Sequence, residues 1–138
     1  MNTDDCIFCT IANGEIPTAT VYEDSVCRVI LDVNPATKGH CLIIPKEHFD
    51  NIYDLDGETA GKLFALATCI ARAMKDALKC DGLNLVQNNG EVAGQTVNHF
   101  HLHLIPRYEG DGLNLNWPQQ EISGEQLEEI RLSIKKSI

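Results

Sequence analysis

Two segments of the chain carry apolar residues at helical spacing. Over about residues 58–79, apolar side chains return every three or four positions and Asp81-Gly82 ends the pattern, which predicts a long helix with one buried face. Near the other end, Ser123 and Gln126 have the form of a capping box. The apolar residues that follow predict a C-terminal helix through Leu127, Ile130 and Ile134.

Short apolar or alternating runs, separated by turn residues, predict five strands. They cover residues 20–22, 26–31, 40–44, 83–87 and 97–105. Residues 6–11 are expected to form a helical turn, and the polar, glycine-rich residues 88–95 a loop. This order predicts an α+β fold, in which a mainly antiparallel five-stranded sheet has the long helix over one face and a C-terminal helix after it. At this length we expect a single domain over residues 1–138.

The charge of the chain narrows the classes of partner. A net charge of −9 argues against DNA or RNA, because nucleic-acid affinity rests largely on cationic side chains. A small anionic ligand stays possible, since a few local donors can hold one phosphate. No apolar run approaches the roughly 18 residues that a membrane helix needs, and the acidic segment Met1 to Asp5 does not have the form of an export signal. We therefore expect a cytoplasmic protein that binds no membrane.

The six cysteines are expected to be reduced thiols, because a cytoplasmic chain of this length needs no disulfide framework. Cys27, Cys41 and Cys69 fall on apolar faces of the predicted elements, which indicates a packing role. Cys6 and Cys9 stand apart from these, since their CxxC spacing is half of a zinc site. That spacing alone also fits two buried thiols or a redox pair, although no thioredoxin-like pattern surrounds it.

Three of the five histidines alternate within one predicted strand, at His99, His101 and His103. On a strand, positions two apart share a face, so the imidazoles would line one side while Phe100, Leu102 and Leu104 pack into the core on the other. Such a row of imidazoles suits metal binding, or acid–base and nucleophilic chemistry near neutral pH. The plain alternative is a set of solvated histidines on an open sheet face.

This alternation resembles the defining motif of the histidine triad (HIT) superfamily. Further segments resemble its Hint-like branch, in order over about residues 6–108: Cys6-Ile7-Phe8-Cys9, Gly14-Glu15-Ile16-Pro17, Val21-Tyr22-Glu23-Asp24, Gly39-His40, Ile44-Pro45-Lys46-Glu47-His48, Asn89-Gly90 and Ala93-Gly94-Gln95. The resemblance implies the HIT-like fold, a homodimer, and a hydrolase of the adenosine 5'-monophosphoramidase type.

The resemblance also implies that His101 is the nucleophile. In the family, the central histidine attacks the α-phosphorus of a purine nucleoside phosphoramidate, and water then hydrolyses the nucleotidyl-histidine. A neutral imidazole suits both steps, because it is a competent nucleophile and a good leaving group. The backbone carbonyl of His99 would hold the proton on the other ring nitrogen. His103 and His40 would line the same pocket, although His40 by itself could simply begin a strand.

The same resemblance assigns further residues to the nucleotide. Phosphate would be held by donors of the segment around the glycine-rich loop, namely Asn88, Gly94, Gln95, Thr96 and Val97; a flexible glycine loop is the alternative. Thr96 stands where many Hint-like proteins have serine. The ribose hydroxyls would donate to Asp32. The base would lie among Ile7, Phe8, Ile11 and Val33, any of which could instead be a core residue.

For the metal, some bacterial-type members of the family complete the cysteine pair with two histidines, at the positions of His48 and His99. This implies a structural zinc ion held by Cys6, Cys9, His48 and His99, and no organic cofactor.

Two other functions remain open beside the phosphoramidase. One is cleavage of dinucleoside polyphosphates, as in the Fhit-like branch. The other is a zinc-stabilised nucleotide-binding module without physiological turnover.

Overall fold

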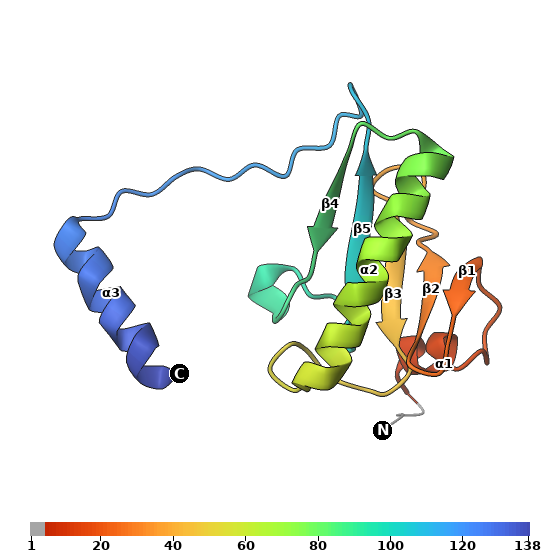
Figure 1. The fold of residues 1–138 in the computed structure, drawn as a ribbon, viewed down its shortest axis with the longest axis horizontal. Coiled ribbons are helices and arrows are strands. Elements are labelled where there is room, and N and C mark those ends of the chain that lie inside the picture. Colours follow the sequence, from red (N-terminus) through yellow and green to blue (C-terminus); the bar gives the residue numbers. More distant parts are fainter. Residues whose placement is uncertain (1–4) are drawn as a thin grey trace.

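The computed structural model describes residues 5–138, and residues 1–4 of the acidic N-terminus lie outside the described residues. The described residues form three α-helices and five strands (Figure 1), together with a short 3-10 helix at Glu91–Ala93. The helices are α1 (Ile7–Ala12), α2 (Gly57–Leu78) and α3 (Gly124–Ser137). The strands are β1 (Thr20–Glu23), β2 (Cys27–Leu31), β3 (Cys41–Pro45), β4 (Gly82–Val86) and β5 (Leu102–Arg107).

The strands form one sheet in the order β1-β2-β3-β5-β4, and each neighbouring pair is antiparallel. The predicted α+β fold with a five-stranded antiparallel sheet is therefore confirmed. Helix α2 runs across one face of the sheet (Figure 1), whereas α1 packs on the other. Strand β3 is buried on both faces, since Cys41 and Ile43 pack under α2 while Leu42 and Ile44 pack with α1.

Helix α2 begins and ends one residue before its predicted bounds. The Asp56 side chain accepts a hydrogen bond from the backbone N–H of Thr59 at the N-terminus, and Lys79, with φ of 55°, closes the C-terminus in the left-handed conformation. Its buried face is formed by Leu63, Ala67, Ile70 and Met74. Among the described residues, no helix is long and apolar enough to cross a membrane.

The predicted strand over residues 97–105 is wrong at its start, because β5 begins only at Leu102. Residues 97–99 form a bend, and the N–H of Phe100 donates to the carbonyl of Phe49 rather than to a neighbouring strand (2.6 Å). Strict alternation of residue types is compatible with this irregular backbone, because Phe100, Leu102 and Leu104 still reach the core beneath α2.

The predicted packing role holds for two of three cysteines. Cys27 and Cys41 are buried in the core, but Cys69 is exposed on α2. The helix turns 100° per residue, so Cys69 lies just outside the stripe that Ile70 occupies.

Candidate active site

The His101 imidazole is held in a single tautomer by the backbone. Its Nδ1 lies 2.7 Å from the carbonyl oxygen of His99, and since a carbonyl only accepts, Nδ1 carries the proton. The ring is buried, which lowers its pKa below the ordinary value and keeps it neutral near pH 7. The Nε2 atom therefore has an unprotonated lone pair, as a nucleophile needs.

A second set of hydrogen bonds places the proton of His103. The backbone N–H of Ala36 donates to Nδ1 of His40 (3.0 Å), so the proton of neutral His40 lies on Nε2. From there it is donated to Nδ1 of His103 (2.9 Å). Burial lowers the pKa of His40 and lowers that of His103 to about 4. His103 is then neutral with its proton on Nε2, in a ring whose centroid is 4.8 Å from that of His101.

A cavity of about 490 Å³ opens beside these two rings. It is lined by His101 and His103 and by six residues expected to contact the nucleotide, namely Phe8, Ile11, Asp32, Val33, Thr96 and Val97. Ile7 does not line it: the α1 helix turns this side chain outward, where it is 48% exposed. The structure therefore places Ile7 outside the cavity, and its contact with the base stays a prediction.

Sequence reasoning missed several residues of the cavity wall. They come from the loop after α1 and from the central strands, namely Ile16, Pro17, Thr18, Ile30, Leu31, Asn34 and Leu42. The alternation within β3 offered a signal, because Leu42 must face opposite to Cys41 and Ile43 and hence toward α1. The loop residues offered none, since nothing local in their sequence places them opposite a strand far along the chain.

The loop before the triad contributes less to this cavity than expected. Asn88 and Gly94 do not line it, and they contact each other instead, with the Asn88 amide 3.5 Å from the Gly94 carbonyl. The Gln95 side chain is buried, accepts from Gly90 N–H (2.8 Å), and donates to the carbonyls of Asp50 (2.6 Å) and Val97 (3.0 Å). In this structure the Gln95 side chain thus holds the loop in place, and its contact with a phosphate stays a prediction.

Four predicted metal ligands come together at the opposite side of the triad. One ligand atom each of Cys6, Cys9, His48 and His99 lies within 4.8 Å of the other three. The Nδ1 atoms of His48 and His99 approach the Cys9 Sγ to 3.3 Å and 3.4 Å. Tetrahedral zinc with thiolate and imidazole ligands sets these atoms about 3.3–3.8 Å apart, so the donor set fits this metal.

Both histidines of the cluster offer Nδ1 to the ligand set, because their other ring nitrogen has a partner outside the cluster. Nε2 of His99 lies 2.8 Å from the carbonyl oxygen of Pro45, and Nε2 of His48 lies 2.7 Å from Oδ1 of Asp50. In the neutral rings, both acceptors hold the proton on Nε2, which leaves Nδ1 unprotonated. Carbonyl and carboxylate partners of this kind orient the imidazole ligands of metal sites.

Known proteins resemble this chain over most of its length. The family model described as HIT domain matches residues 13–110. The chain is 46% identical to a HIT family protein from Bacillus anthracis whose crystal structure superposes with a TM-score of 0.92 over 99% of both chains. It is 36% identical to the adenosine 5'-monophosphoramidase hnt1 of Schizosaccharomyces pombe, over 96% of this chain and 98% of that one.

A third relative bears on the metal cluster. The crystal structure of a zinc-bound histidine triad family protein from Mycobacterium smegmatis is similar with a TM-score of 0.76 and 39% identity, over 97% of this chain and 98% of that one. The matched domain model covers most of the chain, and the triad His99-Phe100-His101-Leu102-His103 lies within the match. The chain belongs to the histidine triad (HIT) family.

Proposed function

We propose that this protein is a nucleotide hydrolase that cleaves purine nucleoside phosphoramidates through a covalent nucleotidyl-His101 intermediate. The observation that carries the proposal is the 2.7 Å hydrogen bond from Nδ1 of His101 to the His99 carbonyl, which leaves Nε2 bare beside a nucleotide-sized cavity. The name of the fission yeast relative, adenosine 5'-monophosphoramidase, supports the choice of substrate class.

In the first step, the Nε2 lone pair of His101 attacks the α-phosphorus and the P–N bond breaks. The electron pair of that bond leaves with the nitrogen, which takes up a proton from solvent water to give the free amine. Thr96 lines the cavity, and its hydroxyl is the group we assign to hydrogen-bond the leaving amine. The Nε2 proton of His103 is directed to a non-bridging phosphate oxygen, whose negative charge grows in the transition state.

In the second step, the oxygen of a water molecule bonds to the same phosphorus, the bond from phosphorus to Nε2 of His101 breaks, and the proton lost by the water returns to solvent. The Nδ1–H of His101 keeps its hydrogen bond to the His99 carbonyl, which stabilises positive charge on the ring while phosphorus is bonded to Nε2. The products are a nucleoside monophosphate and a free His101 ready for another cycle.

The nucleoside is assigned to the part of the cavity beyond the two imidazoles. Phe8, Ile11 and Val33 supply apolar surface for the base. Asp32 supplies carboxylate oxygens for the ribose hydroxyls. One of these oxygens also lies 3.8 Å from Nε2 of His40, so the ribose site adjoins the hydrogen bonds that orient His103.

The test is intact-protein mass spectrometry after brief mixing with an amine-linked adenosine phosphoramidate. We expect one added nucleotidyl group on His101, followed by release of AMP, and no adduct or turnover in His101→Ala. Cys69→Ser, a change at an exposed thiol on α2, is the matched control and should react normally. Full activity of His101→Ala would refute the proposal.

Assays on the same purified protein also distinguish the two alternative functions. Faster turnover of diadenosine polyphosphates than of phosphoramidates would assign it to the Fhit-like activity. Nucleotide binding without adduct or product would make it a binding module.

We further propose that Cys6, Cys9, His48 and His99 hold a structural zinc ion that ties α1 to the sheet. The fit of the two thiols and two Nδ1 atoms to tetrahedral zinc supports this. Zinc would neutralise the thiolates and fix the position of the His99 ring. We expect one zinc ion per chain in the purified protein, and a lower unfolding temperature after chelation.

Cys9→Ser should lose the zinc, because serine is a poor ligand for this ion, whereas Cys41→Ser removes a buried thiol outside the cluster and should keep it. Metal analysis of both variants decides the point. Equal zinc content in Cys9→Ser and the parent protein would contradict the assignment.

We also propose that the protein is a homodimer, as expected from the family. Sedimentation at micromolar concentration measures this directly, and a monomer at all concentrations would contradict it.

A further inference from the structure

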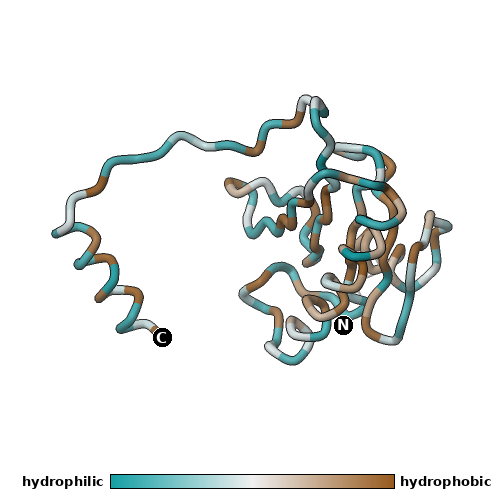
Figure 2. Tube along the Cα trace, turned by 45° about the horizontal axis from the view of Figure 1, so that its top comes forward, coloured by the Kyte–Doolittle hydropathy of each residue, from teal (hydrophilic) through white to brown (hydrophobic). Residues whose placement is uncertain are grey.

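Thr37 is a buried polar residue that does not line the active-site cavity. The trace through the centre of the sheet is largely hydrophobic (Figure 2), because β3 and β5 consist mainly of buried apolar residues. Besides Thr37, the buried polar residues of the described chain are His40, Gln95, His99 and His101. Each of these four belongs to the triad, to the metal cluster or to the structure around them. A buried hydroxyl is costly unless it is hydrogen-bonded, so the contacts of Thr37 indicate its role.

The Thr37 hydroxyl ties the β2–β3 loop, residues 32–40, to strand β5. Its Oγ1 donates to the backbone carbonyl oxygen of Pro106 (2.5 Å) in a buried hydrogen bond. Pro106 lies on the same strand as His103, one of the two imidazoles beside the cavity. The loop is therefore fastened directly to the strand that carries the end of the triad.

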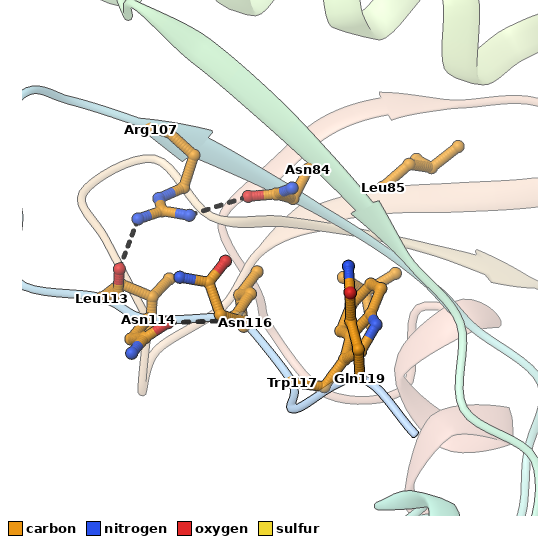
Figure 3. Close-up of a pocket in the computed structure, with 10 residues that line it drawn as sticks. Asn84, Leu85, Arg107, Leu113, Asn114, Asn116, Trp117 and Gln119 are labelled. Atoms are coloured by element: carbon orange, nitrogen blue, oxygen red, sulfur yellow. Dashed lines mark hydrogen bonds between the residues drawn. The ribbon is translucent and has the colours of Figure 1, made fainter. Parts of the chain in front are cut away.

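The part of strand β5 that accepts this bond is itself well held. Arg107, the residue after Pro106, donates to the side chain of Asn84 on the neighbouring strand β4 (2.9 Å) and to the carbonyl of Leu113. Figure 3 shows both bonds, with the Arg107 side chain reaching Asn84 and Leu113 at once. The Pro106 carbonyl is therefore a fixed acceptor, and the Thr37 hydroxyl carries its position into the loop.

The backbone on both sides of the Thr37 side chain holds His40. The N–H of Ala36 donates to Nδ1 of His40 (3.0 Å), and the carbonyl of Thr37 accepts from the backbone N–H of His40 (3.2 Å). A displacement of Thr37 moves both groups, because each belongs to a rigid peptide unit that ends at its Cα atom. The Tyr108 hydroxyl also donates to the loop, at the carbonyl of Lys38 (2.7 Å), but this second bond lies at an exposed point.

The Ala36 N–H decides how the histidine pair, His40 and His103, shares its proton. Nε2 of His40 and Nδ1 of His103 lie 2.9 Å apart, and either nitrogen can be the donor. With an N–H at its Nδ1, His40 keeps its proton on Nε2, and His103 then keeps its own on Nε2. In the reversed arrangement, the Ala36 N–H would face a second N–H, and His103 would turn a lone pair toward the phosphate.

We propose that Thr37 is a positioning residue, whose hydroxyl holds the Ala36 N–H against His40 and so sets the tautomers of the histidine pair. The inference rests on the proposed function, because the attack of His101 on phosphorus is the step that uses the Nε2 proton of His103. Thr37 lies outside the cavity lining. Loss of its hydroxyl should therefore affect the rate of the chemical step more than the affinity for nucleotide.

Substitutions at Thr37 separate the hydroxyl from the shape of the side chain. Thr37→Val removes the hydroxyl and keeps the branch, whereas Thr37→Ser keeps the hydroxyl and loses a methyl group. Thr37→Ala removes the hydroxyl without placing a methyl group against the Pro106 carbonyl, and it is expected to behave as Thr37→Val does. Ile70→Val is the control for lost stability, because it removes a methyl group from the core beneath α2.

The first readout is the tautomer of each ring in the ligand-free protein, measured from the nitrogen chemical shifts of the histidine pair by NMR. We expect the parent protein, Thr37→Ser and Ile70→Val to carry both protons on Nε2. In Thr37→Val, a population with the proton on Nδ1 of both rings should become detectable. One hydrogen bond is worth about a factor of five in such a ratio.

The second readout is the single-turnover rate of nucleotidylation of His101. Thr37→Val should be about threefold to tenfold slower than the parent protein, because the arrangement that donates to phosphate is less populated and less well held. Its affinity for AMP should stay within about twofold. Thr37→Ser and Ile70→Val should keep the rate within about twofold.

Unchanged tautomers in Thr37→Val would overturn the inference, whatever the rate of that variant. Equal losses of rate in Thr37→Val and Thr37→Ser would also overturn it, since they would make the role of Thr37 one of packing. Both outcomes leave the proposed function standing. A parent protein that forms no nucleotidyl adduct refutes the proposed function instead, and the NMR spectra then still decide whether Thr37 sets the tautomers.

Discussion

His40 offers the sharpest test of how the site positions a proton. Its Nδ1 accepts a hydrogen bond from the Ala36 N–H, and its Nε2 donates one to His103. A suitable substitution of His40 can therefore remove one of these bonds and keep the other. The amide nitrogen of glutamine reaches about as far as Nε2, whereas the amide of asparagine reaches only about as far as Nδ1. His40→Gln can therefore keep the donor to His103, and His40→Asn can keep only the contact to Ala36.

The size of the effect follows from the contact that is lost. Leaving a buried imidazole nitrogen without its partner costs about 1–3 kcal/mol. A cost of 1.4 kcal/mol is about a factor of ten in rate. Because this cost is expected to fall mainly on the transition state, His40→Asn should slow nucleotidylation of His101 by about 5-fold to 150-fold, and His40→Gln by no more than about 5-fold.

The assay is single-turnover formation of the nucleotidyl-enzyme, with AMP affinity measured in parallel. A positioning role predicts that the rate of nucleotidylation falls in His40→Asn while AMP affinity changes little. A merely structural role would weaken both and would lower the unfolding temperature of the two variants alike. Equal rates for the asparagine and glutamine variants would refute the reasoning.

Two other predictions concern the body of the fold. Gly39→Ala should lower the free energy of unfolding by about 1–3 kcal/mol in urea titrations, because Gly39 has φ of 95° and a Cβ would lie 2.5 Å from a methyl group of Leu78; unchanged stability would contradict this. Hydrogen bonds from Arg107 hold the pKa of Asp111 well below its ordinary value. The contribution of this ion pair to the free energy of unfolding is therefore present above the ordinary carboxyl pKa, and it is lost as the pH falls from that value toward the lowered pKa. The fluorescence of Trp117 should change over that pH interval in the parent protein, as the segment around Trp117 loosens, but not in Asp111→Asn.

The regular elements were predictable because each has a strong periodic signal. Helix α2 lies within one residue of its predicted bounds, and the capping box of Ser123 and Gln126 is present at α3. The separation of α3 from the sheet (Figure 1) was not predictable, since apolar residues at helical spacing give the same pattern whether the helix packs on its own sheet or on another molecule.

The site was predicted in its chemistry more fully than in its contacts. The four cluster residues and the His101–His99 bond were expected from the family motif, and the structure brings these groups together. The structure places both Ile7 and Gln95 outside the lining of the cavity, for a common reason. A motif aligns residue positions, but the direction of a side chain depends on helix phase for Ile7 and on distant carbonyl partners for Gln95.

The bend before β5 explains how one residue serves two sites. On a regular strand the His99 and His101 rings would point to the same face, and the His99 ring would compete for the nucleotide cavity. The bend at residues 97–99 instead turns the His99 ring to the cysteine pair, while its carbonyl stays 2.7 Å from Nδ1 of His101. Holding the His99 ring in place also restrains this carbonyl, because both groups are attached to the same Cα atom. A zinc ion bound at the cluster should therefore help to hold the His101 ring in the orientation that attack requires. Cys9→Ser should then lower the rate of nucleotidylation even at temperatures where the variant remains fully folded.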